Sequence, residues 1–168
     1  RFKNNDDAYS FMEKCKDATF SVESLEQKPA KKSPTAPFTT STLQQEAARK
    51  LGFSVNQTMI VAQKLYEAGK ITYMRTDSMN LSKDALEAAK LEITNLYGEE
   101  FAQRRAFTNK AKGAQEAHEA IRPSYMNNKT VDGDSSHQRL YDLIWKRTIS
   151  SQMADAQFDR TTVKISIS

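Results

Sequence analysis

The chain has 168 residues, enough for one domain or for one domain with pieces of another. Its hydrophobic share of 38% is ordinary for a globular protein, and the net charge of +4 permits nucleic-acid binding without requiring it. No apolar run could cross a bilayer and no signal-peptide pattern is present, so we expect a cytoplasmic protein with no membrane partner.

The first predicted element is a helix over Asp6–Lys16, with one apolar face. That face ends at Cys15, the only cysteine of the chain. A single cysteine excludes an internal disulfide and a cysteine-rich zinc site. We therefore expect Cys15 to be a small, buried apolar residue of this helix.

Both ends of the chain carry a predicted strand. Apolar and polar residues alternate over Thr19–Glu26 and again over 161–168. We expect these strands to lie side by side and to enclose everything between them as an insertion. Gln27–Pro37 holds three prolines and three lysines, which predicts a linker. Because the chain begins at Arg1 without methionine and ends in a strand, we expect an excised fragment.

Two helices are predicted next. Ser41 with Gln44 forms a capping-box pattern that predicts a helix start, and this helix runs to about Lys50. Its expected apolar stripe is Leu43, Ala47, Ala48 and Leu51. After Gly52 the same pattern recurs at Ser54 and opens a second helix. The residues of that helix expected to face inward are Val55, Met59, Ala62, Leu65 and Tyr66.

The second helix is predicted to end at Gly69, and Lys70–Ser78 then reads as an extended segment. Two helices joined by a tight glycine turn and followed by an extended segment are typical of a helix-turn-helix with a wing. Residues 38–78 are therefore predicted to form a winged-helix-like unit. A plain helical hairpin is the alternative.

The remaining elements are two helices and two loops. Asn80–Tyr97 is predicted to be a helix capped by Ser82, with inward residues Leu86, Ala89, Ile93 and Leu96. The basic stretch Gln103–Gly113 and the polar stretch Tyr125–Ser136 are predicted loops. The last helix is predicted over His137–Gln152. We expect its Trp145 to anchor the core rather than to stack on a base.

The extended segment holds the first chemical candidate. In extended backbone, residues two apart point to the same side, so Ile71, Tyr73 and Arg75 are expected to share one face. A phenol with an ordinary pKa of about 10 is a poor nucleophile until its oxyanion is stabilised. A guanidinium can stabilise that oxyanion and also neutralise a phosphate under attack. The pair therefore suits attack on a phosphodiester, although such a pair is more often packing and surface charge.

The second candidate is the segment Gln115–Pro123. His118-Glu119 begins like the zinc-binding His-Glu-x-x-His motif, but Arg122 stands where the second histidine belongs, which disfavours a metalloprotease. If the segment is helical, His118 and Arg122 lie one turn apart and could handle a phosphate together. The alternative is a surface histidine in a charged helix.

Four segments resemble, in order and spacing, the bacterial type IA DNA topoisomerases, and more closely their topoisomerase I members. The resemblance is dense from about Pro37 to Pro123 and looser beyond. Met74, between the tyrosine and the arginine, is the topoisomerase I form, where topoisomerase III relatives more often carry proline. The matching segments are Pro37–Glu46, Leu65–Gly69, Ile71–Ser78 and Glu116–Pro123.

The resemblance implies a reaction and roles for residues. Tyr73 would match the nucleophile that forms a transient 5′-phosphotyrosyl bond with one DNA strand, before strand passage and religation relax negative supercoils without ATP. Arg75 would match the arginine that positions the scissile phosphate, and His118 a histidine near the cleavage site. Glu67 and Gln63 would face this site. Arg122 is a further candidate for DNA contact, from its spacing to His118.

The resemblance also implies a fold. We expect a mainly α structure with short β, in which a winged-helix domain like that of catabolite activator protein is inserted between strands of a β-rich arch domain. Residues 1–36 would be part of the arch plus a linker, residues 37–153 the helical domain with the tyrosine, and residues 154–168 a returning arch strand.

The family's TOPRIM domain, whose acidic residues bind Mg²⁺, has no counterpart in these 168 residues. We therefore expect Mg²⁺ only in the full-length enzyme, no metal site in this chain, and no relaxation of supercoiled DNA by the chain alone. The expected partners are a single-stranded segment of negatively supercoiled DNA and the remaining domains of the same polypeptide, in the nucleoid.

Three other functions are weighed. A non-catalytic winged-helix DNA-binding module needs outward Arg, Lys or Asn side chains on its second helix, which offers only Asn56, Gln57, Gln63 and Lys64. A tyrosine recombinase needs His-x-x-Arg, whereas three residues separate His118 from Arg122, so we set it aside. A structural protein–protein module that opens and closes a gate is the third.

Overall fold

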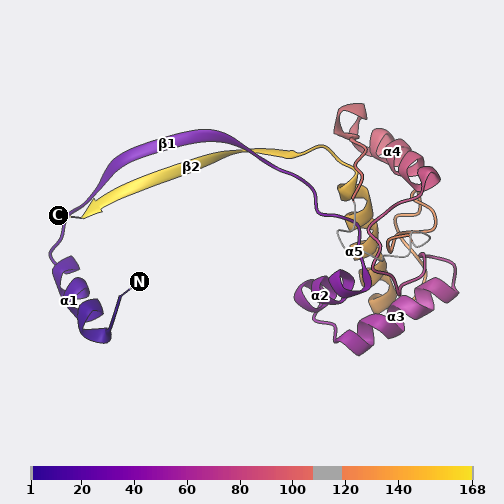
Figure 1. Ribbon diagram of the computed structural model, residues 1–168, viewed down its shortest axis with the longest axis horizontal. Coiled ribbons are helices and arrows are strands. Elements are labelled where there is room, and N and C mark those ends of the chain that lie inside the picture. The colour runs from indigo at the N-terminus through magenta and orange to yellow at the C-terminus, as the bar shows by residue number, and fades with distance from the viewer. Residues whose placement is uncertain (1, 108–118, 168) are drawn as a thin grey trace. The chain divides into compact units, whose positions relative to one another are not determined.

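The computed structural model describes residues 2–107 and 119–167, and the chain divides into two compact units (Figure 1). The strand unit comprises residues 1–32 with 156–168, and the helical unit comprises residues 33–155. None of the helices in the described ranges combines the length and apolar composition that a membrane-spanning segment needs.

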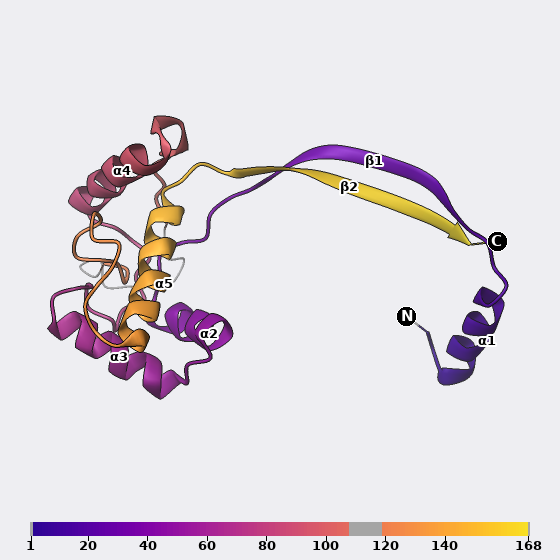
Figure 2. The ribbon, with the colours of Figure 1, turned by 180° about the vertical axis from the view of Figure 1, so that it is seen from behind.

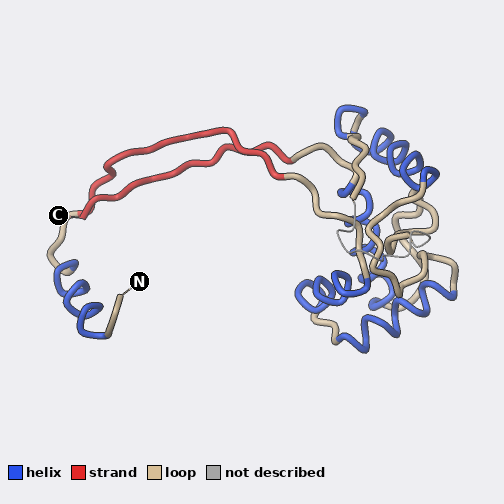
Figure 3. The backbone as a smooth tube through the Cα atoms, in the orientation of Figure 1, coloured by secondary structure: helices blue, strands red, loops and turns tan. Residues whose placement is uncertain are grey.

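The strand unit contains helix α1 (Asn5–Cys15) and the two strands β1 (Phe20–Lys32) and β2 (Ala156–Ile167) (Figure 3). The strands pair antiparallel along their whole length, from Phe20 opposite Ile167 to Lys32 opposite Ala156, with one irregularity between Val22 and Ser24. The predicted pairing of the two terminal strands is therefore confirmed.

The predicted linker is wrong over its first half, because β1 continues through Lys32. Pro29 lies within the ladder, opposite Asp159. Proline cannot donate a ladder hydrogen bond, but in a two-stranded sheet each strand has an unpaired edge where proline is tolerated. Backbone pairing with β2 thus overrides the loop-like composition.

The prediction that Cys15 is buried is also wrong, since its side chain is only half-buried. No described residue of the strand unit is buried, and Phe11 and Met12 on the expected apolar face of α1 remain exposed. One short helix and two strands cannot enclose a core, so amphipathic patterning here does not lead to burial within the unit.

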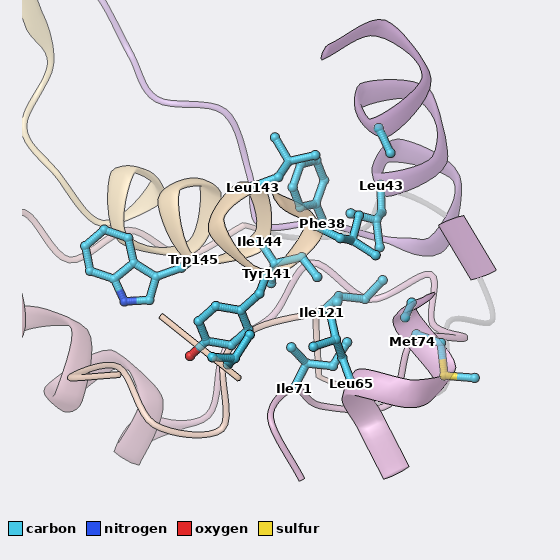
Figure 4. Close-up of a cluster of buried hydrophobic side chains, with 14 of the residues drawn as sticks. Phe38, Leu43, Leu65, Ile71, Met74, Ile121, Tyr141, Leu143, Ile144 and Trp145 are labelled. Carbon is cyan, nitrogen blue, oxygen red and sulfur yellow. The ribbon is translucent and has the colours of Figure 1, made fainter. Parts of the chain in front are cut away.

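The helical unit contains α2 (Thr40–Leu51), α3 (Val55–Glu67), α4 (Lys83–Tyr97), the 3-10 turn η1 (Glu99–Phe101) and α5 (Ser135–Ser151). Helix α5 contacts α2, α3 and α4, so it is the central element, as opposite views show (Figures 1 and 2). Around it lies one hydrophobic core (Figure 4). The core residues labelled there are Phe38, Leu43, Leu65, Ile71, Met74, Ile121, Tyr141, Leu143, Ile144 and Trp145.

Helix α2 begins two residues earlier than the capping box at Ser41 predicts. Its N-cap is Thr39, whose hydroxyl accepts from the Thr42 amide at 3.3 Å while the Thr42 hydroxyl accepts from the Thr39 amide at 2.9 Å. Four hydroxyl residues follow one another here, and any of them could cap a helix. Tertiary contacts select the register, and they leave Ala48, expected in the apolar stripe, exposed.

Helix α3 begins after the predicted cap Ser54, whose hydroxyl accepts from the Gln57 amide at 3.1 Å. Its buried residues are Thr58, Val61, Ala62 and Leu65. Val55 and Tyr66, both expected to face inward, are 58% and 41% exposed. The buried stripe is thus rotated relative to the prediction, because Thr58 can be buried by bonding its hydroxyl to the Ser54 carbonyl.

The last two helices also shift at their starts. Helix α4 begins at Lys83 rather than Asn80, after the predicted cap Ser82. Helix α5 begins two residues before His137, because the carboxylate of Asp134 accepts from the first amides of the helix. The prediction for Trp145 is confirmed: the ring is buried and its Nε1 donates to the Met126 carbonyl at 2.8 Å.

The basic loop is held in place where the structure describes it, over residues 103–107. Arg105 donates to the carboxylate of Asp155 and to the Met153 carbonyl, and its amide donates to the Gln152 side chain. These bonds make Arg105 part of the scaffold, although residues 103–107 form no helix or strand, as predicted. Lys110 and Lys112 lie outside the described residues.

Coarsely, the fold is helical with one two-stranded sheet, and its strands, of 13 and 12 residues, are not short as predicted. The helix-turn-helix part of the winged-helix prediction agrees with α2 and α3. In the described residues of the helical unit after α3, however, the chain forms only isolated bridges and no hairpin that could serve as a wing. The winged-helix insertion and the boundaries after residues 36 and 153 stay predictions.

Candidate active site around Tyr73 and Arg75

The C-terminus of α3 sets the direction of the segment that carries Tyr73. Gly69 has φ +67°, its amide donates to the Tyr66 carbonyl at 2.8 Å, and the Lys70 amide donates to the Leu65 carbonyl at 2.8 Å. This is the Schellman arrangement, which needs a residue that tolerates a left-handed conformation. The chain therefore leaves the helix along one fixed path.

Beyond this turn, one side of the segment is bonded to residues 120–124. The Thr72 amide donates to the Arg122 carbonyl at 2.9 Å, and the Thr72 hydroxyl donates to the Ala120 carbonyl at 2.7 Å. The Ser124 amide donates to the Lys70 carbonyl at 2.9 Å. These bonds fix the backbone immediately before Tyr73.

The other end of the segment is bonded to the first residue of α2. The hydroxyl of Thr40 donates to the Met74 carbonyl at 2.8 Å and accepts from the Thr76 amide at 2.9 Å. The Thr40 amide donates to the Thr76 carbonyl at 2.9 Å. The backbone on both sides of Arg75 is therefore fixed as well.

Burial alternates along this fixed segment. Met74, Thr76 and Ser78 are buried, whereas Tyr73 and Arg75 are exposed, with Tyr73 at 43%. The expectation that Ile71 shares their face is wrong: it lies in the core beside Leu65 (Figure 4), because the backbone bends at Thr72. Buried neighbours thus hold the exposed side chains of Tyr73 and Arg75 at set positions.

The ring of Tyr73 contacts a second tyrosine. Tyr66, in the last turn of α3, meets it edge to face, with 5.2 Å between ring centroids and 65° between planes. Aromatic pairs of this geometry are favourable beyond the area they bury. We missed Tyr66 by assigning it to the core. Two tyrosines that flank a glycine turn at seven-residue spacing are the signal that could have indicated it.

Arg75 lines a hollow of about 410 Å³ together with the outer face of α3. Gln63 and Glu67 line it too, and the Gln63 amide donates to the Glu67 carboxylate at 2.7 Å. The structure thus brings three predicted site residues to one place. The hollow is lined by Asn56, Met59, Ile60, Gln63, Lys64, Glu67 and Arg75.

Arg75 differs from the other arginines of the helical unit. Within the described ranges, it has no ion-pair, hydrogen-bond or ring partner for its guanidinium, whereas the other six each bond to a carboxylate or a backbone carbonyl. Those six are Arg49, Arg104, Arg105, Arg122, Arg139 and Arg147. An exposed guanidinium without a protein partner is available for an anionic ligand.

The guanidinium of Arg122, by contrast, is bound within the protein. It donates to the Glu119 carboxylate at 2.7 Å and to the Pro123 carbonyl at 2.9 Å, and its side chain is only 16% exposed. The other oxygen of Glu119 accepts from the Ser82 amide at 2.6 Å. Burial raises the pKa of Glu119, but the hydrogen bonds from Arg122 and Ser82 outweigh it and leave the pKa below its ordinary value.

The second chemical candidate, the segment Gln115–Pro123, is described only from Glu119 onward. His118 lies outside the described residues. From Glu119 to Pro123 the chain is extended, with Ile121 bridged to Phe38 and Pro123 to Ile71, so the one-turn helical spacing we considered for Arg122 is wrong in this part. The segment instead supports the backbone at Thr72.

Comparisons with known proteins agree on one family. The family described as DNA topoisomerase matches residues 1–168. The DNA topoisomerase 1 of Streptomyces coelicolor is 56% identical over 153 residues, which cover 87% of this chain. A protein named "DNA topoisomerase 1 type prokaryotic", from Acanthamoeba polyphaga mimivirus, is 48% identical over 167 residues, 98% of this chain.

A solved structure is also similar. The full-length topoisomerase I from Thermotoga maritima superposes with a TM-score of 0.75 at 36% identity, over 95% of this chain and 29% of that one. The chain spans 16% of the Streptomyces protein and 20% of the mimivirus protein. The matches thus concern a small part of each relative.

Proposed function

The chain belongs to the bacterial type IA DNA topoisomerases, and from this membership we propose that it carries the nucleophile and the phosphate-binding arginine of a DNA strand-cleavage and religation reaction. One observation carries the proposal. Tyr73 and Arg75 are exposed on a segment whose intervening and flanking residues are buried and hydrogen-bonded, and Arg75 has no partner among the described residues.

The chemistry is a reversible transesterification. The phenol of Tyr73 loses its proton and its oxygen bonds to the scissile phosphorus, while the bond from phosphorus to the 3′ oxygen breaks and that oxygen gains a proton. The product is a 5′-phosphotyrosyl link. Arg75 neutralises the phosphate as charge builds on it. The reverse reaction reseals the strand, and no ATP is needed because one phosphodiester replaces another.

The described part of the chain offers no cluster of side chains that would hold a metal ion. Mg²⁺ is implied by the family, but among residues 2–107 and 119–167 no three His, Cys, Asp or Glu side chains are grouped to hold an ion. We therefore assign no step to a metal here. Because the chain spans only 16% to 29% of the relatives named above, our proposal includes that it does not relax supercoiled DNA by itself.

The remaining details of the proposal concern architecture and partners. Helices α2 and α3 would belong to a winged-helix domain inserted into an arch domain, of which β1 and β2 are two strands. The partners would be a single-stranded segment of negatively supercoiled DNA and the other domains of the same polypeptide, in the cytoplasm. The helix-turn-helix of the helical unit and the antiparallel terminal strands support this arrangement.

A chimera tests the proposal. This chain would replace the matching segment of the Streptomyces coelicolor topoisomerase, and relaxation of a supercoiled plasmid and covalent DNA adducts would be measured. We expect Tyr73→Phe to abolish both activities, while the control Tyr97→Phe, at another exposed tyrosine, keeps them. A non-catalytic DNA-binding module would lose nothing on Tyr73→Phe, and that result would reject the proposal.

A further inference from the structure

The outer face of α3 carries a surface that strand cleavage at Tyr73 does not itself require. The hollow beside Arg75 extends along the helix from Glu67 back to Asn56. At a rise of about 1.5 Å per residue this is about 16 Å, the length of about five stacked nucleotides. We propose that this face, which we term the α3 track, binds the single DNA strand next to the scissile phosphate. The inference rests on the proposed function.

Two cations on the track are available for phosphates. Lys64 and Arg75 line the hollow, and within the described ranges neither side chain has a hydrogen-bond or ion-pair partner. Glu67 is the one carboxylate in the lining, and it accepts a hydrogen bond from Gln63. The lining therefore has a net charge of +1, which favours a polyanion. Arg75 takes the phosphate nearest Tyr73, and Lys64 takes a following one.

The track also offers apolar surface between its charges. Ile60 is 48% exposed and Met59 is half-buried, and both line the hollow. A nucleobase presents flat apolar faces that pack against such side chains. This combination of cations with an apolar floor distinguishes a single strand, whose bases are free to pack, from duplex DNA, whose bases are stacked inside.

Two amides complete the lining and provide contacts for base edges. Asn56 lies at the N-terminal end of the track, and Gln63 lies one helical turn before Glu67. Because the nitrogen of Gln63 donates to Glu67, its oxygen is left as an acceptor. The track thus offers contacts for phosphates, for the flat faces of bases and for base edges.

Binding of a labelled single-stranded oligonucleotide by the 168-residue chain tests the phosphate contact. We expect Lys64→Glu to weaken binding about tenfold and to reduce the slope of log K against log salt by about 1. The control is Lys90→Glu, which makes the same charge change at an exposed lysine of α4 and is expected to stay within about twofold of wild type. Equal losses in both variants, or no detectable binding by the wild type at low salt, would overturn the track.

A second measurement tests the base contact. Ile60→Ser is expected to weaken binding of the base-bearing oligonucleotide about fivefold and to leave binding of an abasic oligonucleotide unchanged. Val55→Ser, at an exposed apolar residue of α3 outside the hollow, is the control and should change neither. An equal loss on both oligonucleotides would overturn the base contact. These assays keep Tyr73 intact, so their failure is separate from failure of the chimera test.

Discussion

Arg75 and Arg122 lie on two extended segments that are bonded to each other, yet the fold uses them in opposite ways. Arg122 binds Glu119 and Pro123 and is largely buried, whereas Arg75 is exposed and has no partner within the described ranges. The segment of Arg122 holds the backbone at Thr72, next to Tyr73. The difference teaches that the fold uses one arginine to support the backbone near Tyr73 and leaves the other available to an anionic ligand.

The largest effect expected from this contrast is on activity. In the chimera, Arg75→Ala should lower the rate of strand cleavage by about 10² to 10³, as loss of one group that stabilises transition-state charge does elsewhere. Arg75→Lys should recover part of that loss, because lysine keeps the charge without the planar fork. An Arg75→Ala chimera that cleaves DNA at the wild-type rate would break the comparison.

The next effect is on folding. Arg122→Ala should lower the free energy of unfolding of the helical unit by about 2 to 3 kcal/mol, because it leaves the half-buried Glu119 carboxylate without its charged partner. Fluorescence of Trp145, the single tryptophan, reports this unit during urea denaturation. Arg75→Ala is the control and should change stability by less than about 0.5 kcal/mol. A larger loss of stability in Arg75→Ala than in Arg122→Ala would contradict the supporting role of Arg122.

Acid should weaken the support in the same way. The pKa of Glu119 is held below its ordinary value of 4.5, so its stabilisation is complete above that pH and is lost as the pH falls through the lowered pKa. At pH 7, Glu119→Gln should cost about 1 to 2 kcal/mol. The same urea measurements should show this difference shrinking at acid pH. A difference independent of pH would mean that the charge of Glu119 does not matter.

The smallest expected effect concerns Tyr66. Tyr66→Leu removes the ring that contacts Tyr73 and should lower the cleavage rate of the chimera about threefold to tenfold, whereas Tyr66→Phe keeps the ring and should be near wild type. The affinity for DNA should change little in either variant. If phenylalanine and leucine have equal rates, the ring contact does not position Tyr73.

The sequence predicted the local backbone features around Tyr73 and Arg75 because the signals involved are local. The caps at Ser54 and Ser82 and the turn at Gly69 depend on neighbours within one helical turn, and all three are present in the structure. The same local rules failed at Ser41, where contacts of Thr40 with residues far along the chain decide the start of α2.

The binding of Arg122 within the protein could not be predicted by pattern, because it depends on partners brought together by the tertiary fold. Spacing suggested that Arg122 handles a phosphate. In the structure its guanidinium instead donates to the Glu119 carboxylate, which also accepts from the Ser82 amide. Spacing also assigned Tyr66 to the core. Its exposure could not be predicted, because the packing of the helix decides which of its apolar residues stay at the surface.

Locating the covalent bond tests the central claim most directly. The chimera would be denatured during cleavage to trap its DNA adduct, digested with protease, and the nucleotide-bearing residue identified by mass spectrometry. We predict that the 5′ phosphate of the cleaved strand is esterified to the phenol oxygen of Tyr73. A nucleotide on any other residue, or an adduct that still forms in the Tyr73→Phe chimera, would contradict the claim that the fold presents Tyr73 as the nucleophile.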